Sequence, residues 1–395
     1  MPAHSTGAIH RTRPVRILTI AALTALALSL PAGPLAAEGK GDAGKTACVK
    51  DLAAAGTAAM NDADRNVPPG TWRIPPRLLP PPAGASRELQ AIIRESKQPT
   101  IAEVLAMVPK SREGWKKLQA ALDAQPAANA PKLAKALGVT ITPDTIAGVK
   151  VFRLTPAKVD PAHRNHLFVH VHGGAYVLNA GLAGQTEAIM IAAKAGIPVI
   201  SIDYRMPPDH PFPAALEDVT AVWQALVKTH DPATLAMGGT SAGAGLSMAA
   251  LIHFRSQGLP MPAALFLGTP WADLTETGDS FFINEGIDRT LVTWKGILEN
   301  AARLYADGRD LKEPLLSPLY GDLSGFPPTL LFTGTRDLFL SLTARAHRRL
   351  RDAGVPADLH VFEGFSHGEY ISLRDTPESK AAYRELAAFL KRHLK

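Results

Sequence analysis

The sequence has only one cysteine, Cys48, among 395 residues, and it has little charge of one sign. A single cysteine excludes an intrachain disulfide. The basic excess of +6 includes Arg11, Arg13 and Arg16, and without those three arginines 39 basic residues face 36 acidic ones. No basic run is interleaved with aromatic residues. We therefore expect no nucleic-acid partner.

A long apolar run is also missing. Residues 17–30, "ILTIAALTALALSL", follow the three arginines but are too short to span a bilayer comfortably. A basic stub before a short apolar core is typical of a Sec-type signal peptide. We expect residues 1–37 to be this signal, the mature protein to be periplasmic or secreted, and no stable membrane span to remain after cleavage. An uncleaved anchor is the alternative, and N-terminal sequencing would separate the two.

The remaining chain divides by its patterns into two parts. Residues 38–138 predict an N-terminal extension with two cap helices, at 87–97 and about 100–124, after a proline-rich stretch at 71–86. Residues 139–395 alternate short apolar strands with helices, which predicts a mostly parallel eight-stranded sheet covered by helices on both faces. The expected strands begin near residues 139, 149, 167, 198, 234, 263, 328 and 358, and the expected helices are 185–195, 213–228, 242–257 and 341–353. An insertion at about 273–316 interrupts this alternation and should lie at the ligand-binding edge of the sheet.

The segment Gly239-Thr-Ser-Ala-Gly243 contains a serine where a strand ends and a helix begins. A serine on such a sharp turn exposes its hydroxyl at the sheet edge, and its neighbours two positions away must be small. An ordinary helix cap is the alternative. The strand–turn–helix context favours Ser241 as a nucleophile.

A nucleophilic serine needs a base, and the base needs a carboxylate that orients it. Asp337 and His367 each follow an expected strand. With Ser241 they give the chain order Ser, Asp, His, which is the order found in folds with this kind of serine turn. Taken singly, Asp337 could be a helix cap and His367 a surface histidine. Their common position at strand ends predicts a catalytic triad.

The stretch "FVHVHGGAY", residues 168–176, ends a strand with two glycines whose backbone is bare. We expect the N–H groups of Gly173 and Gly174, with that of Ala242, to bind the oxyanion that forms when Ser241 attacks a carbonyl. His172 should hold this loop in place. His170 and His172 also form an H-x-H pair, but no further ligand lies at metal-binding spacing, and we expect no metal.

Together the motifs "HGGAY", "DYRMPPDHPFPAALEDV", "GTSAG", "TRD" and "GFSHG" resemble the bacterial hormone-sensitive-lipase-like esterases of the α/β-hydrolase fold. The resemblance covers about residue 139 to the C-terminus. It implies carboxylic-ester hydrolysis without a cofactor, the same triad and oxyanion residues, and a helical cap built from the N-terminal helices and the insertion.

Some features depart from that family pattern. Thr240 replaces a frequent Asp, Ala175 replaces a third glycine, and no further acid follows Asp337 closely. The segment 72–82 is similar to exported esterases that act on xenobiotics such as sulfonylurea herbicides. Aromatic residues near the cap should either pack in the core or line an acyl pocket; they are Tyr176, Trp271, Phe281 and Phe282.

The sequence therefore predicts an exported serine carboxylesterase that hydrolyses short-chain or small alkyl esters, xenobiotic esters among them. A lactonase or an amidase of the arylformamidase type would use the same triad, and a non-catalytic small-molecule-binding protein is a further alternative. The partner is a small-molecule ester, and a homodimer is left open.

Overall fold

The computed structural model describes residues 70–71, 74 and 76–395. The predicted signal peptide, the first part of the N-terminal extension (residues 38–69) and Cys48 lie outside these residues. The described residues divide into two units, 83–395 and the short stretch before residue 83. That stretch contains no helix or strand, as its proline content predicts. No helix in the described part of the chain is long and apolar enough to cross a bilayer.

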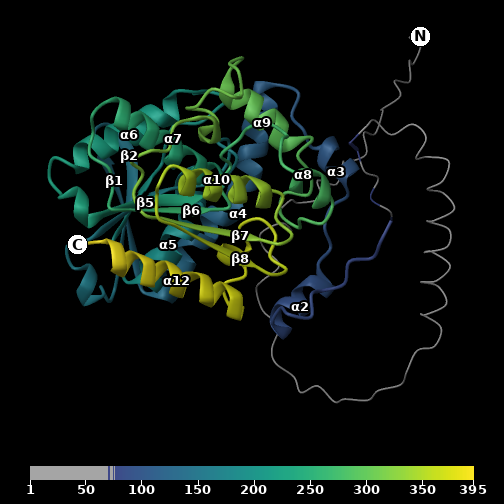
Figure 1. The fold of residues 1–395 in the computed structure, drawn as a ribbon, viewed down its shortest axis with the longest axis horizontal. Coiled ribbons are helices and arrows are strands. Elements are labelled where there is room, and N and C mark those ends of the chain that lie inside the picture. The colour runs from purple at the N-terminus through teal and green to yellow at the C-terminus, as the bar shows by residue number, and fades with distance from the viewer. Residues whose placement is uncertain (1–69, 72–73, 75) are drawn as a thin grey trace, which may run out of the picture. The chain divides into compact units, whose positions relative to one another are not determined.

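Residues 139–395 fold around one eight-stranded sheet in the order β1-β2-β4-β3-β5-β6-β7-β8 (Figure 1). Strands β3 to β8 pair in parallel, whereas β2 pairs antiparallel with both β1 and β4. The predicted mostly parallel eight-stranded sheet is confirmed. The strands are β1 Val139–Ile146, β2 Val149–Pro156, β3 Leu167–Val171, β4 Val199–Ile202, β5 Leu235–Thr240, β6 Ala264–Gly268, β7 Thr329–Gly334 and β8 Ala357–Phe362.

Helices cover both faces of the sheet and create two separate apolar cores. One core lies under α6 (Ala214–Leu226), α7 (Ala242–Ser256) and α10 (Leu340–Asp352). The other lies under α5 (Gln185–Ala195) and α12 (Pro377–His393). In Figure 1 the two groups flank the strands from opposite sides. The central strands are buried on both faces, which explains why they are mostly apolar along their length instead of alternating apolar and polar residues.

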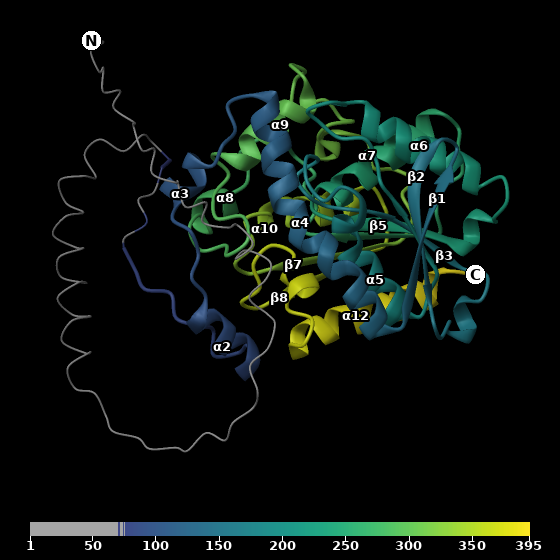
Figure 2. The same cartoon turned by 180° about the vertical axis from the view of Figure 1, so that it is seen from behind.

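The N-terminal helices differ from the prediction. The prediction of a single helix at about 100–124 is wrong. Helix α3 (Ile101–Ala106) ends before Pro109, and a separate helix, α4 (Arg112–Leu137), begins after its N-cap Ser111. Helix α4 also continues through Pro126 and Pro131, which the sequence predicted to lie beyond it. Helix α4 packs against α5 (Figure 2). Tertiary packing of this kind offsets the backbone hydrogen bonds that a proline removes from a helix. Helix α2 (Arg87–Glu95) lies close to its predicted position.

The insertion after β6 contains two helices, α8 (Ser280–Ile283) and α9 (Ile297–Ala306), joined by a loop. A further short helix, α11 (Glu369–Ser372), follows the loop after β8. The segments that follow β3, β5, β7 and β8 leave the sheet at the carboxyl ends of parallel strands. This edge is where open α/β sheets bind ligands, and it brings the predicted site residues together.

Candidate active site

Ser241 occupies the turn between β5 and α7 with φ of 62° and ψ of −125°, a conformation that L-residues rarely adopt. The turn lies against the end of β3. A Cβ atom at Gly239 would lie 1.9 Å from the carbonyl oxygen of Val171, and one at Gly243 would lie 2.0 Å from the same oxygen. Only glycine fits at either position, and this close approach lets the serine hydroxyl face the pocket.

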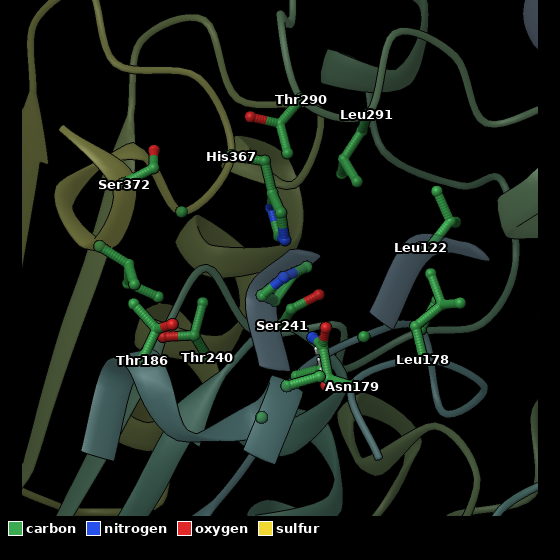
Figure 3. Close-up of a pocket in the computed structure, with 18 of the residues that line it drawn as sticks. Leu122, Leu178, Asn179, Thr186, Thr240, Ser241, Thr290, Leu291, His367 and Ser372 are labelled. Atoms are coloured by element: carbon green, nitrogen blue, oxygen red, sulfur yellow. Dashed lines mark hydrogen bonds between the residues drawn. The ribbon is translucent and has the colours of Figure 1, made fainter. Parts of the chain in front are cut away.

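His367 and Asp337 lie on neighbouring loops, after β8 and β7, and their side chains meet. Nδ1 of His367 is 3.1 Å from Oδ1 of Asp337. The carboxylate is held in turn by the Thr333 hydroxyl and the Phe339 N–H, which donate to it over 2.9 and 2.8 Å. Nε2 of His367 is buried and has no hydrogen-bond partner in the described chain, and its ring points toward Ser241 (Figure 3).

Charges around His367 favour its protonated form. Burial lowers the pKa of this imidazole, but the charge of Asp337, its hydrogen bond and the charge of Asp288 together outweigh burial and raise the pKa. An imidazole with a buried carboxylate on Nδ1 keeps Nε2 free to accept a proton. The pair therefore has the geometry of a general base with its orienting acid.

Each predicted oxyanion donor is an N–H group whose peptide unit is held by a hydrogen bond to the carbonyl oxygen of the same unit. In a trans peptide the C=O and N–H point in opposite directions, so a bonded carbonyl fixes where its N–H points. The His172 carbonyl, which shares a peptide unit with the Gly173 N–H, accepts a 2.8 Å bond from the Tyr204 hydroxyl. The Tyr204 ring also stacks on the His172 ring at 4.1 Å between centroids.

The other two peptide units are held in the same way. The Gly173 carbonyl, opposite the Gly174 N–H, lies 2.8 Å from His172 Nδ1 and accepts from Asn179 Nδ2 at 3.1 Å. The Ser241 carbonyl, opposite the Ala242 N–H, accepts N–H bonds from two residues at 3.0 Å each, Gly245 and Trp271. No acceptor within residues 76–395 takes the N–H of Gly173 or Gly174. These donors are oriented and free.

The two glycines of this loop are required by space and by conformation. A Cβ at Gly173 would lie 2.7 Å from the Thr240 carbonyl oxygen. Gly174 has φ of +117°, and a Cβ there would lie 2.4 Å from the Leu178 carbonyl oxygen. Replacement by any other residue would displace the loop that carries the donors.

A cavity of about 340 Å³ lies over Ser241 and has two unlike walls. Figure 3 labels Thr186, Thr240 and Ser372 on one side of Ser241, and Leu122, Leu178 and Leu291 together with Asn179 on the other. The first wall comes from the sheet edge, α5 and α11, and the second, mainly apolar wall comes from the N-terminal helices, the oxyanion loop and the insertion. The pocket can therefore distinguish the two sides of a substrate.

Both histidines of the H-x-H pair are engaged within the protein. The ring of His170 binds the Ser201 hydroxyl at 2.9 Å and the Glu187 carboxylate at 3.1 Å. Burial lowers the pKa of His172 to about 4, so this ring is neutral and can donate from Nδ1 to the Gly173 carbonyl. As expected, it holds the loop. Within residues 76–395, no group of three or more His, Cys, Asp or Glu side chains could hold a metal ion.

Most of the aromatic residues near the cap pack in the core. Tyr176 stacks on Tyr305 with ring centroids 3.9 Å apart, and Trp271 and Phe281 are fully buried, whereas Phe282 is 60% exposed. None of these side chains lines the cavity over Ser241. The residues that sequence reasoning missed are polar: Asn179 and Tyr204, which hold the oxyanion loop, and Asp288, discussed below. The position of Tyr204 directly after Asp203, at the end of an expected strand, was the one sequence feature that could have indicated its role.

The proline-rich loop after β4 braces the same region. Asp209 forms ion pairs with Lys116, at 2.9 Å, and with Arg112 of α4 at 2.5 Å. Arg205 binds Asp218 at the start of α6 over 2.8 Å. These ion pairs give Asp209 and Asp218 a structural role.

The parallel sheet, its covering helices and the serine-bearing turn at its edge define this molecule as an α/β hydrolase. A family model described as the α/β-hydrolase fold matches residues 168–371. The crystal structure of esterase E25 is 51% identical, with a TM-score of 0.81 over 82% of this chain and 99% of that one. An esterase of the bacterial hormone-sensitive lipase family is 31% identical, with a TM-score of 0.67 over 78% and 99% of the two chains.

Two relatives found by sequence carry related activities. An acetyl-hydrolase of Streptomyces hygroscopicus is 33% identical over 62% of this chain and 81% of its own length. An esterase of Acinetobacter venetianus is 30% identical over 64% and 82%. The chain belongs to the bacterial hormone-sensitive-lipase-like carboxylesterase family of the α/β hydrolases. It is a carboxylic ester hydrolase, which decides against the non-catalytic binding protein considered above.

Proposed function

We propose that this enzyme hydrolyses small carboxylic esters through Ser241, His367 and Asp337. The observation that carries the proposal is the position of Ser241 on its strained turn, below the unpartnered Nε2 of His367, whose other ring nitrogen binds Asp337. The Oγ atom bonds to the ester carbon while its proton moves to Nε2. The oxyanion is then stabilised by the N–H groups of Gly173, Gly174 and Ala242.

The tetrahedral intermediate collapses when the bond to the alcohol oxygen breaks and Nε2 returns its proton to that oxygen. An acyl-enzyme on Ser241 remains. Water attacks it with His367 as base, the bond to Oγ breaks, and the acid leaves with the serine proton restored. The Asp337 carboxylate stabilises the imidazolium at each step, and the atoms balance without a cofactor.

Pocket size supports a small substrate. Ligand pockets commonly measure about 300–1,000 Å³, and the cavity over Ser241 is near the lower limit. Its apolar wall, with Leu122 and Leu291, suits an alkyl or aryl substituent. Short acyl esters and small alkyl esters of aromatic xenobiotics are the proposed substrates, while lactones and aryl formamides are alternatives for the same triad.

The experiment compares hydrolysis of p-nitrophenyl acetate, butyrate, octanoate and palmitate by the wild type, Ser241→Ala and Ser256→Ala. Ser256 lies at the exposed end of α7 and is the matched control. We expect activity that falls with chain length, is lost by about 10³-fold or more in Ser241→Ala and persists in Ser256→Ala. A fluorophosphonate should lose fluoride and add its phosphonyl group to Ser241 alone, which mass spectrometry would detect. Activity that survives in Ser241→Ala would refute the nucleophile assignment.

The export signal and the quaternary structure are separate parts of the proposal. We propose that residues 1–37 direct the enzyme to the periplasm or the medium, as their basic and apolar segments suggest. N-terminal sequencing of the protein recovered from each fraction would test this. Light scattering of the purified enzyme would decide between a monomer and the homodimer left open above.

A further inference from the structure

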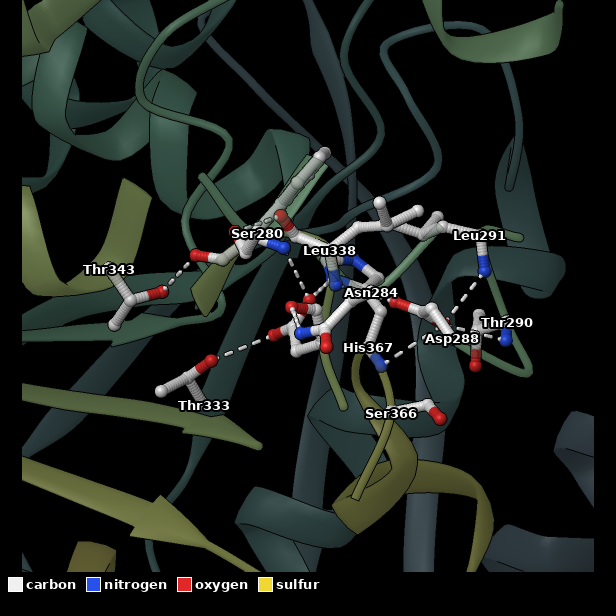
Figure 4. A network of polar contacts seen from close by, with 12 residues as sticks. Ser280, Asn284, Asp288, Thr290, Leu291, Thr333, Leu338, Thr343, Ser366 and His367 are labelled. Atoms are coloured by element: carbon white, nitrogen blue, oxygen red, sulfur yellow. Dashed lines mark hydrogen bonds and ion pairs between the residues drawn. The ribbon is translucent and has the colours of Figure 1, made fainter. Parts of the chain in front are cut away.

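A second buried carboxylate lies beside the proposed triad. Asp288 belongs to the loop between α8 and α9 of the insertion, and its side chain is fully buried. Within the described residues, this carboxylate accepts hydrogen bonds only from backbone N–H groups, which Figure 4 draws with their neighbours. The donors and their distances are Thr290 at 2.8 Å, Leu291 at 3.0 Å and His367 at 3.5 Å to Oδ1, and Leu338 at 2.8 Å to Oδ2.

These four donors come from three different loops. Leu338 directly follows Asp337, and His367 is the proposed base itself. Thr290 and Leu291 line the cavity over Ser241. One carboxylate therefore joins the acid loop, the base loop and a wall of the pocket. The sequence after Asp337 has no acid of its own close by, so the insertion supplies the carboxylate that caps this turn.

The neighbours of Asp288 reinforce the same connection. The Arg289 N–H donates to the Ser366 hydroxyl at 3.0 Å, and its guanidinium binds the Glu369 carboxylate, with Nε 2.9 Å from Oε1. Glu369 in turn accepts the Ser366 N–H at 2.7 Å. From α8's end, Asn284 Nδ2 donates to the Asp337 carbonyl at 2.8 Å. Both loops that carry the proposed acid and base are thus held by the insertion.

We propose that Asp288 is a positioning residue, which aligns Asp337 and His367 with each other and with the pocket wall formed by residues 290–292. This inference rests on the proposed function of those two residues. A misplacement of about 1 Å in a catalytic group can cost on the order of 10²-fold in rate. Loss of the bonds from Leu338 and His367 would permit such a displacement.

The charge of Asp288 also acts on His367. The charged groups near this ring are Asp337 and Asp288, together with Glu369, which is paired with Arg289. Burial, followed by the neighbouring Asp337 charge, raises the pKa of Asp288 to about 6. Above this pH Asp288 is mostly ionised, and its charge raises the pKa of His367. A neutral substitute should therefore lower the pKa of the base.

The test uses Asp288→Ala, Asp288→Asn and the control Asp273→Asn. Asp273 is an equally buried carboxylate at the start of the same insertion, but it binds Thr275, Thr277, Tyr320 and Arg345 and none of the proposed site residues. With p-nitrophenyl butyrate, we expect kcat of Asp288→Ala to fall about 10- to 100-fold with KM changed much less. Asp288→Asn, which keeps one acceptor oxygen, should fall less.

The pH profile gives a readout that a purely structural defect would not move. The acid limb of kcat/KM should shift to lower pH in Asp288→Asn and stay in place in Asp273→Asn. An equal loss of kcat in Asp273→Asn, or full kcat with an unmoved limb in Asp288→Asn, would overturn the positioning role. These comparisons are made only after the wild type is shown to be active and Ser241→Ala inactive. An inactive wild type or an active Ser241→Ala would instead refute the proposed function, and the role of Asp288 with it.

Discussion

The anchoring of the oxyanion loop makes a prediction for the single-atom change Tyr204→Phe. The Tyr204 hydroxyl donates 2.8 Å to the His172 carbonyl and so fixes the direction of the Gly173 N–H. The substitution removes this bond and leaves the stacking of the ring on His172 in place. The Gly174 donor keeps both of its anchors, His172 and Asn179.

The expected loss in rate follows from these contacts. Removing an oxyanion donor altogether costs about 10²–10³-fold in kcat. Here the donor remains and only its restraint is lost, and a neutral hydrogen bond is worth about 0.5–1.5 kcal/mol, or roughly 2- to 10-fold in rate. We therefore expect kcat of Tyr204→Phe to fall about 2- to 10-fold with little change in KM.

The assay is steady-state hydrolysis of p-nitrophenyl butyrate beside urea unfolding of each variant. Tyr383→Phe is the control, because this buried hydroxyl has no hydrogen-bond partner in the described chain and belongs to α12, on the far face of the sheet. It should keep wild-type kcat. An unchanged kcat in Tyr204→Phe would refute the idea that the carbonyl anchor orients the donor, and so would a loss above 100-fold.

Two further predictions concern the base and the pocket. Nearby carboxylates raise the pKa of His367, and this base must be neutral to accept a proton. We therefore expect kcat/KM to fall toward low pH with a midpoint above about 6.5. A midpoint below that value would contradict the effect of these carboxylates on His367. Leu122→Trp should lower the ratio of octanoate to acetate hydrolysis about tenfold by filling the apolar wall, whereas Leu105→Trp, at a position outside the cavity, should leave the ratio unchanged.

The sheet could be predicted well because its local and tertiary requirements agree. Buried strands between two helical layers are mostly apolar, and those runs end at glycine or polar residues that mark the loops. Helix α5 has its predicted bounds because its local end signal agrees with the fold: Gly196 follows its last residue in a left-handed conformation. Helix α12 was missed although Thr376 and Pro377 form an N-terminal signal, with the Thr376 hydroxyl capping Ser379.

The N-terminal helices were predicted less well because tertiary packing outweighs local preference there. Pro126 and Pro131 predict the end of a helix, yet α4 continues past both while packed on α5 and over the pocket. The aromatic residues near the cap show the same limit. Composition leaves open whether Tyr176 lines a pocket or a core, and only the stacking against Tyr305 decides for the core.

By itself, the sequence determined which residues could take part in the chemistry. Ser241, Asp337, His367 and the glycine pair each follow a strand, and parallel strands place such positions at one edge. Only the tertiary structure decided what holds them there, because those contacts join segments far apart in the chain. Tyr204 reaches back to the His172 carbonyl, and Asp288 bridges the loops after β7 and β8 from an insertion about 50 and 79 residues away. Directional hydrogen bonds of this kind leave no periodic pattern in a sequence, so only folding reveals them.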